Sequence, residues 1–474
     1  MAGVDCSTQG TKVVVVDVED GRVVATGRGT HEVSGTGGAR ETDPGEWSRA
    51  LAAALAQTGR GREVAAVSVG GQQHGLVVLS ADGRPLRPAV LWNDTRSAPD
   101  AAALVVDGGG PDAWARDVGV VPVASFTVTT WAWLRRTEPH VADAARAVRL
   151  PHDELTTRLV GRSVTDRGDA SGTGWWSTRD EAYAKEVLAL ERVRLDPAML
   201  PAVLGPGEPA GAVSDAAAEA FGLPAGIPVG PGTGDNMAAA LGLALPAGTA
   251  ALSLGTSGTV YATSDRRPVD PSGIVAGFAD ATGRFLPLAC TLNATLAVDR
   301  VAAWLGLDRD AVDDGGEVVV LPYLDGERTP NLPSAAGTIA GLRHDTTPGQ
   351  ILRAAYEGAV VSLLDALERV AEQTGGLTPD APLVLIGGGA RGRVWRDTVA
   401  RLSGRPLLVP AAEELVALGA AAQAAAVLTG EPPAEVATRW DASRGALVEP
   451  VARDDDALAR HHRVRTATDP LNHP

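Results

Sequence analysis

Short apolar runs alternate with polar glycine turns along the chain, and the pattern is clearest at its start. The small apolar run 2–6 leads into the turn 7–11, and a β-branched run follows over residues 12–18. The dipeptide Asp20-Gly21 then reverses the chain into a further apolar run. Because β-branched residues favour strands and Asp-Gly favours tight turns, this region predicts antiparallel strands joined by short turns.

The same pattern of strands and turns recurs in the second half of the chain. Residues 249–262 are typical of two strands around the turn 255–259, which aligns with the turn 7–11. Further along, Val67–Gly71 resembles Leu385–Gly389, and the two matches occur in the same order. The repeated order predicts a duplicated α/β domain.

Helical periodicity separates these strands. Pro44 opens an amphipathic stretch, and Pro348 opens a longer one whose apolar positions follow helical spacing until Gly375. Residues 97–190 are predicted to be mostly helical. Strands alternating with helices predict layered α/β domains with mixed sheets flanked by helices, and the cleft between two such domains is the expected ligand site.

Length and composition narrow the class of protein. The 474 residues leave room for two or three domains, and we expect a division into residues 1–245 and 246–474 with a hinge at 245–248. The net charge of −16, from 42 basic and 58 acidic side chains without a basic run, argues against a nucleic-acid partner.

Targeting signals and cysteine usage indicate the compartment. The two cysteines, Cys6 and Cys290, do not form a disulfide framework, which favours a reducing compartment. The chain starts directly with a strand-like run, so we expect no leader, and it lacks an apolar stretch of about 18 residues. These features predict a cytoplasmic protein without a membrane partner.

The first turn has the residues needed to wrap the end of a polyphosphate. Main-chain N–H groups and hydroxyls of the turn 7–11 can donate to anionic oxygens, Asp5 can hold Mg²⁺, and Lys12 can bring a positive charge to the transferred phosphoryl group. The turn 255–259 has the same capability without the acid, because Ser253 stands where Asp5 does. The alternative is an ordinary hairpin with a surface lysine.

A late glycine-rich segment leaves a second enzyme class open. Residues 387–392 fit G-x-G-x-x-G after an apolar strand, and Glu413 follows about 20 residues later, as in a dinucleotide-binding fold. Its late position in the chain disfavours a dehydrogenase, and the same glycines could let an adenosine lie against the backbone. A Walker A loop is excluded because the sequence contains no Gly-Lys dipeptide.

Asp235 is the candidate general base. It follows a strand and a glycine turn and opens a helix, so its carboxylate is expected to project into a cleft; the alternative is that it only caps the helix. The segments 72–74 and 92–96 supply amides, an imidazole, an aromatic ring and the Arg96 guanidinium, which are groups that bind polyols. The eight histidines show no metal-ligand spacing, so no zinc site is expected.

These segments belong to a longer series of motifs. In chain order they are Asp5-Cys6-Ser7-Thr8, Gly71-Gln72-Gln73-His74-Gly75, Trp92-Asn93-Asp94, Ser171-Gly172-Thr173, Gly234-Asp235-Asn236, Ser253-Leu254-Gly255-Thr256-Ser257-Gly258, Leu321 to Pro330, Gly387-Gly388-Gly389-Ala390-Arg391 and Ala417-Leu418-Gly419-Ala420-Ala421. The series resembles that of the FGGY carbohydrate kinases, and the resemblance extends to about Leu428.

The resemblance implies two actin-like (ribonuclease H-like) domains, with ATP, Mg²⁺ and a sugar as ligands. Residues 1–245 would bind the sugar and carry the catalytic aspartate, and residues 246–474 would bind ATP. By motif match, Asp235 is the expected base and Asp5 the metal-associated catalytic aspartate. The other expected site residues are Gln73, His74, Trp92 and Asn236 for the substrate and Ser7, Thr8, Lys12, Gly255, Thr256, Gly388 and Gly389 for ATP.

Within that family the motifs look most like those of the xylulokinase branch, which implies conversion of D-xylulose to D-xylulose 5-phosphate. Glycerol is disfavoured because the Arg-Glu pair of glycerol kinases is missing at Gln73-His74, whereas many xylulokinases have methionine in place of Gln73. The alternatives are a kinase for ribulose, ribitol or a deoxyketose and a non-catalytic actin-like nucleotide binder. Cys6 replaces a glycine of many members, and we expect its side chain to point into the core. Dimers are common in the family, so a homodimer is one expected assembly.

Overall fold

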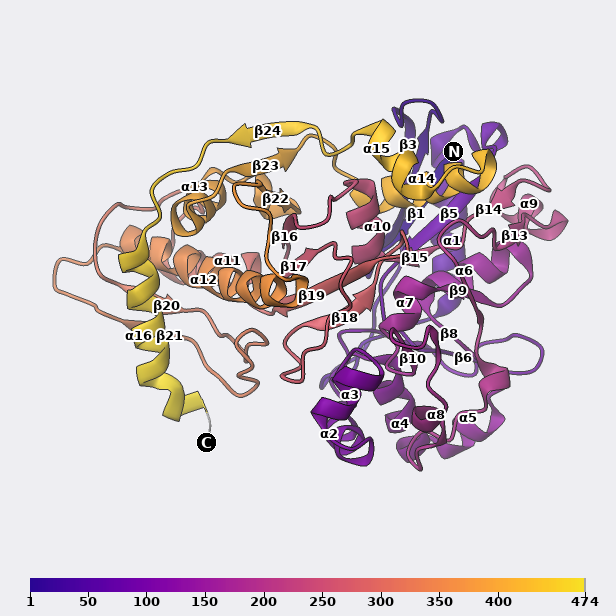
Figure 1. The fold of residues 1–474 in the computed structure, drawn as a ribbon, viewed down its shortest axis with the longest axis horizontal. Coiled ribbons are helices and arrows are strands. Elements are labelled where there is room, and N and C mark those ends of the chain that lie inside the picture. Colours follow the sequence, from indigo (N-terminus) through magenta and orange to yellow (C-terminus); the bar gives the residue numbers. More distant parts are fainter. Residues whose placement is uncertain (473–474) are drawn as a thin grey trace. The chain divides into compact units, whose positions relative to one another are not determined.

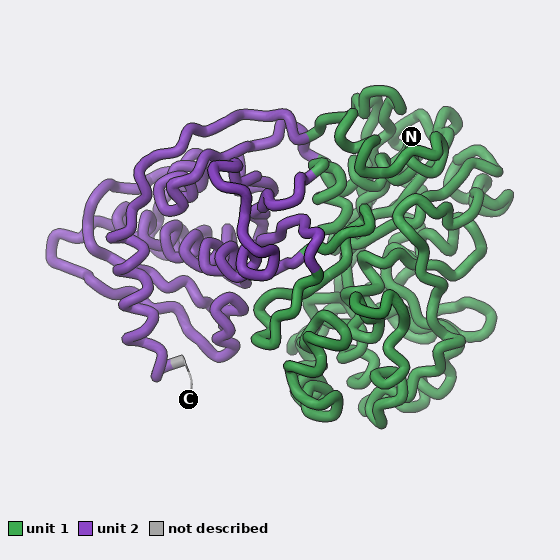
Figure 2. Tube along the Cα trace, in the orientation of Figure 1, with its two compact units in different colours: residues 1–244, 267–286, 414–442 green, residues 245–266, 287–413, 443–474 purple. Residues whose placement is uncertain are grey.

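A computed structural model describes residues 1–472, and helices flank mixed sheets in it (Figure 1). This confirms the predicted α/β fold. The chain forms two compact units: unit 1 comprises residues 1–244, 267–286 and 414–442, and unit 2 comprises residues 245–266, 287–413 and 443–474 (Figure 2). Two segments of unit 1 therefore lie beyond the boundary that we expected after residue 245.

The central sheet of unit 1 is mixed, and its apolar side chains form a buried core with those of α1. The strand order is β13 (Gly211–Ala212), β14 (Pro228–Val229), β5 (Val67–Gly71), β1 (Ala2–Cys6), β2 (Gly10–Val16), β3 (Val23–Thr30). β1 runs antiparallel to β2 and parallel to β5, and β15 (Thr233–Gly234) also pairs parallel with β5. Cys6 is fully buried in β1, as expected.

Short strands in unit 1 pair outside this sheet. The pairs are β4 (Glu41–Thr42) with β7 (Ala89–Val90), β6 (Val77–Leu79) with β8 (Ala147–Arg149), β9 (Val164–Asp166) with β12 (Ala202–Leu204) and β10 (Trp176–Ser177) with β11 (Ala182–Tyr183). β18 (Ala276–Ala279) also belongs to this unit. Several of these strands interrupt the region that we expected to be mostly helical.

The helices of unit 1 include one pair that approaches very closely. They are α1 (Pro44–Thr58), α2 (Ala98–Asp107), α3 (Pro111–Asp117), α4 (Thr127–Thr137), α5 (Pro139–Ala144), α6 (Pro151–Val160), α7 (Arg167–Ser171), α8 (Lys185–Ala189), α9 (Asp215–Phe221), α10 (Asp235–Gly242), α14 (Leu415–Thr429) and α15 (Pro433–Trp440). A Cβ atom on Gly419 would lie 1.9 Å from the carbonyl oxygen of Ala238, and one on Gly3 would lie 1.8 Å from that of Ala417. Glycine therefore lets α14 contact both α10 and β1, which fixes the start of α10 beside the sheet (Figure 1).

Unit 2 contains a second mixed sheet and the longest helix. Its strand order is β19 (Phe285–Thr291), β17 (Gly258–Ala262), β16 (Ala250–Leu254), β22 (Leu383–Ile386), β23 (Leu407–Pro410), β24 (Gly445–Val448), and β20 (Val319–Leu321) pairs separately with β21 (Thr338–Ala340). The helices are α11 (Thr295–Leu305), α12 (Pro348–Thr374), α13 (Arg393–Ser403) and α16 (Asp455–Asn472). Thr347 and Gln350 form a capping box at the start of α12, and Gly375 ends it with a φ of 83°, as the sequence predicts.

The predicted duplication appears in the strand pairing of the two units. In unit 1 the antiparallel hairpin β1–β2 has β5 as the parallel neighbour of β1. In unit 2 the antiparallel hairpin β16–β17 has β22 as the parallel neighbour of β16. Each unit thus brings a hairpin turn and the end of a parallel strand to the same edge of its sheet.

The polar C-terminal stretch forms a helix up to residue 472, and residues 473–474 lie outside the described part. Asp365 of α12 forms ion pairs with His462 and Arg465 of α16, and His461 is buried. Among residues 1–472 we find no helix long and apolar enough to cross a membrane.

Candidate active site

Three parallel strand ends bring the main candidate residues of unit 1 together. Gly70 of β5 pairs with Asp5 of β1 on one side and with Thr233 of β15 on the other. Parallel strands that share a register deliver the residues after them to one edge of the sheet, where ligands bind in open α/β sheets. Asp5, the segment 72–75 and Asp235 therefore lie at the same edge.

Asp235 begins α10 but does not cap it. The N-cap is Gly234, whose lack of a side chain leaves room for Gln73: a Cβ atom on Gly234 would lie 2.7 Å from Gln73 Cγ. The main-chain N–H and the amide nitrogen of Asn236 both donate to Asp235 Oδ1, at 2.8 and 2.9 Å. The half-buried carboxylate is thus held from one side, and the alternative of a simple helix cap is wrong.

The surroundings of Asp235 favour its protonated form more than water does. Burial raises the pKa of Asp235 to about 7, the Asp5 and Asp169 carboxylates add to the rise, and the hydrogen bonds from Asn236 oppose it. A carboxylate with a pKa near the working pH is suited to accept and release a proton. The chemistry available to Asp235 is therefore general base catalysis.

A hydrogen-bond chain connects Asp235 to the other substrate candidates. Asn236 Nδ2 donates to Gln73 Oε1 at 3.0 Å as well as to Asp235. The Gln73 amide is therefore oriented by protein, with its oxygen toward Asn236. This contact joins two motifs that are far apart in the sequence.

His74 adopts a backbone conformation that is uncommon for a residue with a side chain. Its φ is 68°, and the N–H of Gly75 donates to the carbonyl of Gln73, which makes a tight γ-turn. His74 Nδ1 donates to the carbonyl of Gly172 at 2.9 Å, so the proton of the neutral ring is on Nδ1 and Nε2 is the acceptor nitrogen. The strained turn and the fixed tautomer are typical of a functional position.

Trp92 and the first turn are also joined. Trp92 Nε1 donates to Thr8 Oγ1 at 3.0 Å. The N–H and hydroxyl of Ser7 both donate to the carbonyl of Gly10, at 3.0 and 2.8 Å, so these two donors close the turn. The ligand contacts predicted for Ser7, Thr8 and Trp92 stay predictions.

The Arg96 guanidinium, which the sequence suggested as a polyol-binding group, has partners within the protein. Its guanidinium pairs with Asp94 at 2.6 Å and with Glu41, and it lies over the Trp133 ring, 4.3 Å from the centroid. These contacts satisfy the guanidinium within the protein. Arg96 therefore braces the loop that carries Trp92.

Asp5 and Lys12 face each other across the β1–β2 hairpin. Burial raises the pKa of Asp5 to about 6, while Lys12 lowers it and Glu414 raises it further. Lys12 Nζ lies 2.8 Å from Glu414 Oε2, and Arg28 pairs with the other oxygen of Glu414 at 2.7 Å. Lys12 therefore has an anionic partner supplied by the segment that returns to unit 1 at residue 414.

Asp5 has the property that a magnesium ligand requires. Its Oδ1 is buried and has no hydrogen-bond partner among residues 1–472. Mg²⁺ in kinases is typically held by one or two carboxylates together with substrate phosphates and water, so a single orphaned carboxylate oxygen fits the expected role.

The two glycine turns of unit 2 also lie at one sheet edge. The turn 255–257 connects β16 to β17, and the hydroxyl and N–H of Thr295 at the start of α11 donate to the carbonyl of Gly255, at 2.8 and 3.1 Å. A Cβ atom on Gly389 would lie 2.8 Å from Leu254 Cβ, whereas one on Gly388 would meet nothing within 4 Å. Gly255, Thr256, Gly388 and Gly389 are thus close in the fold, and Gly388 borders open space.

Sequence reasoning missed a buried group of charged residues in unit 1: His152, Asp153, Asp166 and Asp169. His152 and Asp153 lie in α6, Asp166 is the N-cap of α7, and Asp169 lies in α7. Their spacing resembles no motif, and only the fold brings them together. The nearest signal was the motif Ser171-Gly172-Thr173, which begins at the last residue of α7.

Comparison with protein families gives two matches. The model of the FGGY family of carbohydrate kinases, N-terminal domain, matches residues 1–242, and that of the C-terminal domain matches residues 250–428. The domain boundary that we expected from the sequence, between residues 245 and 246, falls between the two matched segments.

The chain is also similar to named proteins over nearly its whole length. It is 61% identical over 475 residues to a xylulose kinase from Streptomyces coelicolor, covering 99% of this chain and 97% of that protein. It is 60% identical over 472 residues to a xylulose kinase from Streptomyces rubiginosus, with the same coverage of 99% and 97%. The crystal structure of xylulose kinase from Bifidobacterium adolescentis is similar with 37% identity and a TM-score of 0.84, covering 98% of this chain and 99% of that chain.

These matches confirm the resemblance carried by the motifs and contradict the dehydrogenase alternative. They extend through both units, and they include the glycine-rich segment 387–392 that had left that alternative open. The chain belongs to the FGGY family of carbohydrate kinases.

Proposed function

We propose that this kinase transfers the γ-phosphoryl group of ATP to the 5-hydroxyl of D-xylulose, giving D-xylulose 5-phosphate and ADP. The proposal is supported by similar proteins that are named xylulose kinases and that match this chain over nearly its full length. Its central observation is Asp235, a half-buried carboxylate with a raised pKa that is connected by hydrogen bonds to Gln73 and Asn236.

Asp235 acts as the general base. As the 5-oxygen of the sugar attacks the γ-phosphorus, the new O–P bond forms, and the bond between that phosphorus and the oxygen bridging to the β-phosphate breaks. The hydroxyl proton moves to Asp235, and the electron pair of the broken bond leaves with ADP. Asn236 holds the carboxylate through two hydrogen bonds to Oδ1, so it is pre-oriented for this transfer.

Four side chains orient the sugar in this proposal: Gln73, His74, Trp92 and Asn236. Gln73 keeps its oxygen on Asn236, so its NH₂ group is the part suited to donate to a ligand. His74 presents Nε2 as an acceptor for a hydroxyl, because Nδ1 donates to Gly172. The aromatic ring of Trp92 provides an apolar wall. Alternating donors, acceptors and an apolar surface are the chemistry that polyols require.

The phosphate side of the reaction needs positive charge and hydrogen-bond donors. Asp5 would hold Mg²⁺, which neutralises charge on the phosphate oxygens when bound. Lys12 and the turn with Ser7 and Thr8 are proposed to face the phosphates. In unit 2, the glycine turns with Gly255, Thr256, Gly388 and Gly389 are proposed to contact ATP, and the open space at Gly388 supports this role.

A panel of sugars in an assay coupled to ADP release tests the proposal. We expect D-xylulose to give the highest kcat/KM, with lower values for D-ribulose, ribitol, a deoxyketose and glycerol. A higher kcat/KM for another polyol would reassign the substrate. ATP binding without sugar-stimulated ADP release for any member of the panel would instead support a non-catalytic nucleotide binder.

A further inference from the structure

Behind the substrate residues of unit 1 lies a buried charged group that the mechanism above does not use. We call it the His152 cluster: His152, Asp153, Asp166 and Asp169. His152 Nδ1 lies 2.8 Å from Asp169 Oδ2, and its Nε2 lies 3.2 Å from Asp153 Oδ1. Burial lowers the pKa of His152, but the three carboxylates outweigh it and raise the pKa to about 9. The three carboxylates thus favour the charged form of the imidazole, which has a carboxylate oxygen close to each ring nitrogen.

The Asp169 side of the cluster contacts the loop 72–75, which we call the first substrate loop. Asp169 Oδ2 lies 2.8 Å from His152 Nδ1. Burial raises the pKa of Asp169, and its interactions with His152, the Gln73 side chain and the main chain of His74 lower it. Three residues further along the chain, the carbonyl of Gly172 accepts from His74 Nδ1. α7 and the residue after it thus contact the loop that carries Gln73 and His74, two of the four side chains proposed to orient the sugar.

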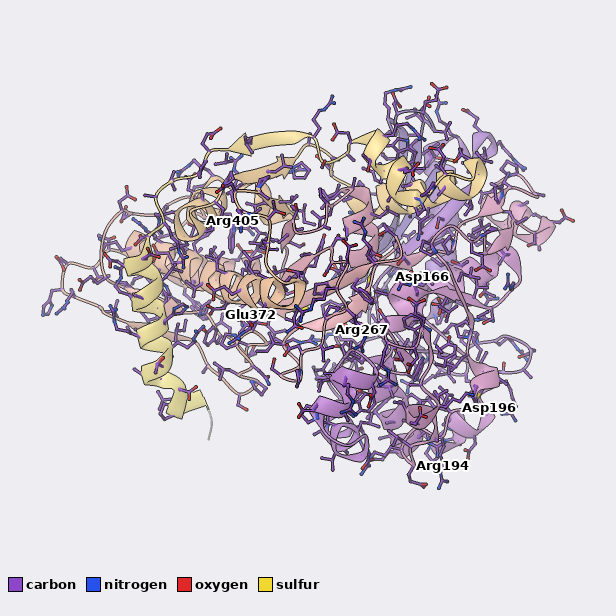
Figure 3. All side chains as sticks on the ribbon, viewed as in Figure 1. Asp166, Arg194, Asp196, Arg267, Glu372 and Arg405 are labelled. Atoms are coloured by element: carbon purple, nitrogen blue, oxygen red, sulfur yellow. The ribbon has the colours of Figure 1, made fainter. Side chains whose placement is uncertain are left out.

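The Asp166 side contacts the segment 232–236, the second substrate loop. Asp166, labelled in Figure 3, accepts from the Thr233 hydroxyl at 2.7 Å, two residues before Asp235. The same carboxylate accepts from the main-chain N–H groups of Gly168 and Asp169, at 2.8 and 2.9 Å. The position of α7 is therefore linked to the position of the catalytic aspartate.

The ring of His152 also packs against the backbone that enters each loop. A Cβ atom on Gly232 would lie 2.5 Å from His152 Cδ2, and one on Gly71 would lie 3.0 Å from His152 Cβ. Glycine at both positions permits this approach. His152 is thus in contact with the start of both substrate loops.

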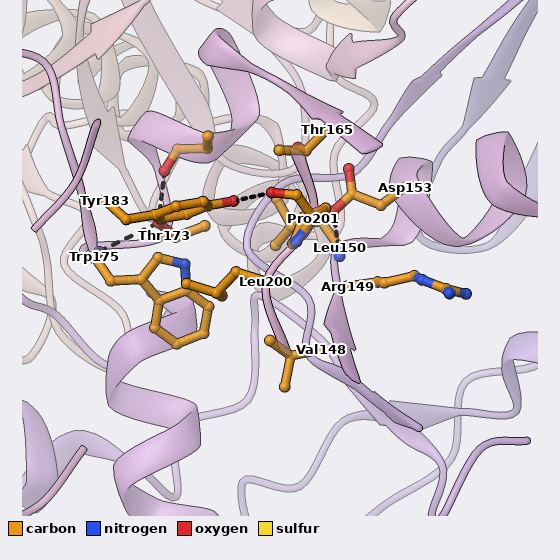
Figure 4. Close-up of a pocket in the computed structure, with 11 residues that line it drawn as sticks. Val148, Arg149, Leu150, Asp153, Thr165, Thr173, Trp175, Tyr183, Leu200 and Pro201 are labelled. Atoms are coloured by element: carbon orange, nitrogen blue, oxygen red, sulfur yellow. Dashed lines mark hydrogen bonds between the residues drawn. The ribbon is translucent and has the colours of Figure 1, made fainter. Parts of the chain in front are cut away.

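The remaining member of the cluster faces away from the loops. Asp153 accepts from the main-chain N–H of Leu150 at the start of α6, and it lines a small pocket with Thr165, Tyr183 and Leu200 (Figure 4). The cavity volume of about 10 Å³ leaves room for one water molecule at most. In the part of the chain that the structure describes, no group of three or more His, Cys, Asp or Glu side chains is arranged to hold a metal ion, and the His152 cluster is therefore not a metal site.

We propose that His152, Asp166 and Asp169 are positioning residues that hold the two substrate loops in register, Asp169 through Gln73 and His74 and Asp166 through Thr233. The inference rests on the proposed function for the identity of the sugar. It assigns separate tasks to the two carboxylates: Asp169 sets the groups that bind the sugar, and Asp166 sets the base that takes its proton. His152 joins the two by its contacts with both loops.

The first test compares Asp169→Ala with Asp169→Asn. Asparagine keeps the size of Asp169 and an acceptor oxygen beside the first substrate loop, and its NH₂ group can donate to Nδ1 of a neutral His152. We expect Asp169→Ala to weaken D-xylulose binding, measured by calorimetry, about ten-fold or more, and Asp169→Asn to restore it to within about three-fold. Equal losses in the two variants would overturn the inference, because they would show that only the charge matters.

Asp153→Asn is the matched control. It removes a buried carboxylate from the same cluster and keeps an oxygen for the N–H of Leu150, but it lies on the side without substrate loops. We expect the affinity for D-xylulose to change less than about two-fold. A loss as large as that of Asp169→Ala, or an equal loss of ATP affinity in that variant, would indicate a general structural role and overturn the proposal.

The second test separates kcat from sugar affinity. Thr233→Val keeps the shape of the side chain but loses the hydroxyl that bonds Asp166, whereas Thr233→Ser keeps the hydroxyl. We expect Thr233→Val to lower kcat about ten-fold with D-xylulose affinity nearly unchanged, and Thr233→Ser to restore kcat. A Thr233→Val variant with full kcat would contradict the link between Asp166 and the base.

A crystal structure of the Asp169→Ala variant, compared with that of the wild type, separates this inference from the choice of sugar. We expect the Gln73 amide and the His74 ring to be displaced, whichever sugar the panel identifies. Unmoved loops would overturn the inference even if D-xylulose is the substrate. If another sugar gives the highest kcat/KM, the proposed function fails, and the same variants are measured with that sugar.

Discussion

Units 1 and 2 begin with the same arrangement of strands, yet the residues at the strand ends differ in charge. In unit 1, Asp5 pairs with Lys12 across the hairpin. In unit 2 the equivalent pair is Ser253 with Thr259, which carries no charge. A shared backbone therefore presents an acid and a base in one unit and only neutral donors and acceptors in the other. The strand arrangement provides the location, and single residues decide the chemistry.

The segments after the parallel strands differ in the same way. After β5, the chain continues with Gln72, Gln73 and His74, and a γ-turn fixes the histidine at a φ of 68°. After β22, it continues with Gly387 at a φ of 84° and with Gly388 beside open space. At the edge of its sheet unit 1 presents oriented polar side chains, whereas unit 2 presents mainly main-chain groups. This difference suits the proposed roles, in which unit 1 binds a small polyol and unit 2 binds the larger nucleotide.

The largest expected effect comes from Asp235, which has no charged counterpart in the turns of unit 2. We expect Asp235→Asn to lower kcat by about 10²–10⁴, because the amide cannot accept the hydroxyl proton. Sugar affinity should change little, since asparagine can keep the hydrogen bonds from Asn236. Steady-state kinetics with D-xylulose and calorimetry of sugar binding measure the two quantities. A variant with wild-type kcat would remove the proposed difference between the units.

The next largest effect on kcat is expected from a variant of Lys12. Arg28 is the matched control, because both side chains pair with Glu414. We expect Lys12→Ala to lower kcat about ten- to a hundred-fold, since it removes positive charge beside Asp5. Arg28→Ala loses an exposed ion pair with the same acid, and we expect less than about two-fold. Initial rates at saturating D-xylulose and ATP measure both. Equal losses in the two variants would show that Glu414, not the phosphate, is the relevant partner of Lys12.

A variant of Gly388 tests the nucleotide contacts proposed for unit 2, whose strand ends carry no charge. A methyl group there meets no protein atom within 4 Å, so Gly388→Ala should leave the melting temperature unchanged. If ATP occupies that space, the methyl group should raise the KM for ATP by about ten-fold and leave the affinity for sugar unaffected. Gly207 of unit 1 also borders open space, and Gly207→Ala is the control, with no expected change in either KM. An unchanged KM for ATP would place the nucleotide elsewhere.

The main elements and the placement of the candidate residues around Asp235 could be predicted because their signals are local. The capping box at Thr347 and the glycine at 375 are local determinants of helix ends, and the structure has α12 between them. The motif around Asp235 contains both the glycine that leaves space for Gln73 and the asparagine that holds the carboxylate. Signals of this kind depend on residues that are close in sequence, so they can be recognised without knowledge of the tertiary contacts.

The rest depended on contacts between distant segments. His152 and Asp169 look like ordinary polar residues of two helices, and only the packing of α6 against the sheet brings them behind Gln73. The return of residues 414–442 to unit 1 could not be read from composition, although it supplies Glu414 to Lys12. The short strands within residues 97–190 are set by their partners rather than by periodicity.

The smallest effect is a pH dependence that should distinguish the acid of unit 1 from the neutral unit 2. Asp235 must be unprotonated to act as a base, and its pKa is raised to about 7. The kcat/KM for D-xylulose should therefore fall about five-fold between pH 7 and pH 6, with a slope approaching one. Initial rates between pH 5 and pH 9 test this. A profile that stays flat down to about pH 5 would contradict the assignment.

The same pKa predicts an opposite effect on stability. Because the pKa of Asp235 is higher in the folded protein than in the unfolded chain, the folded state binds the proton more tightly, and the free energy of unfolding decreases as the pH rises from about 4 to 7. Above that range the unprotonated carboxylate costs about 1–3 kcal/mol, which Asp235→Asn removes. Thermal unfolding should show the variant more stable than the wild type at pH 8 and equally stable at pH 4. If the difference in stability is the same at both pH values, the charge of the Asp235 carboxylate is not its cause. The charge of Asp235 would then destabilise the folded protein no more than the neutral residues of unit 2 do.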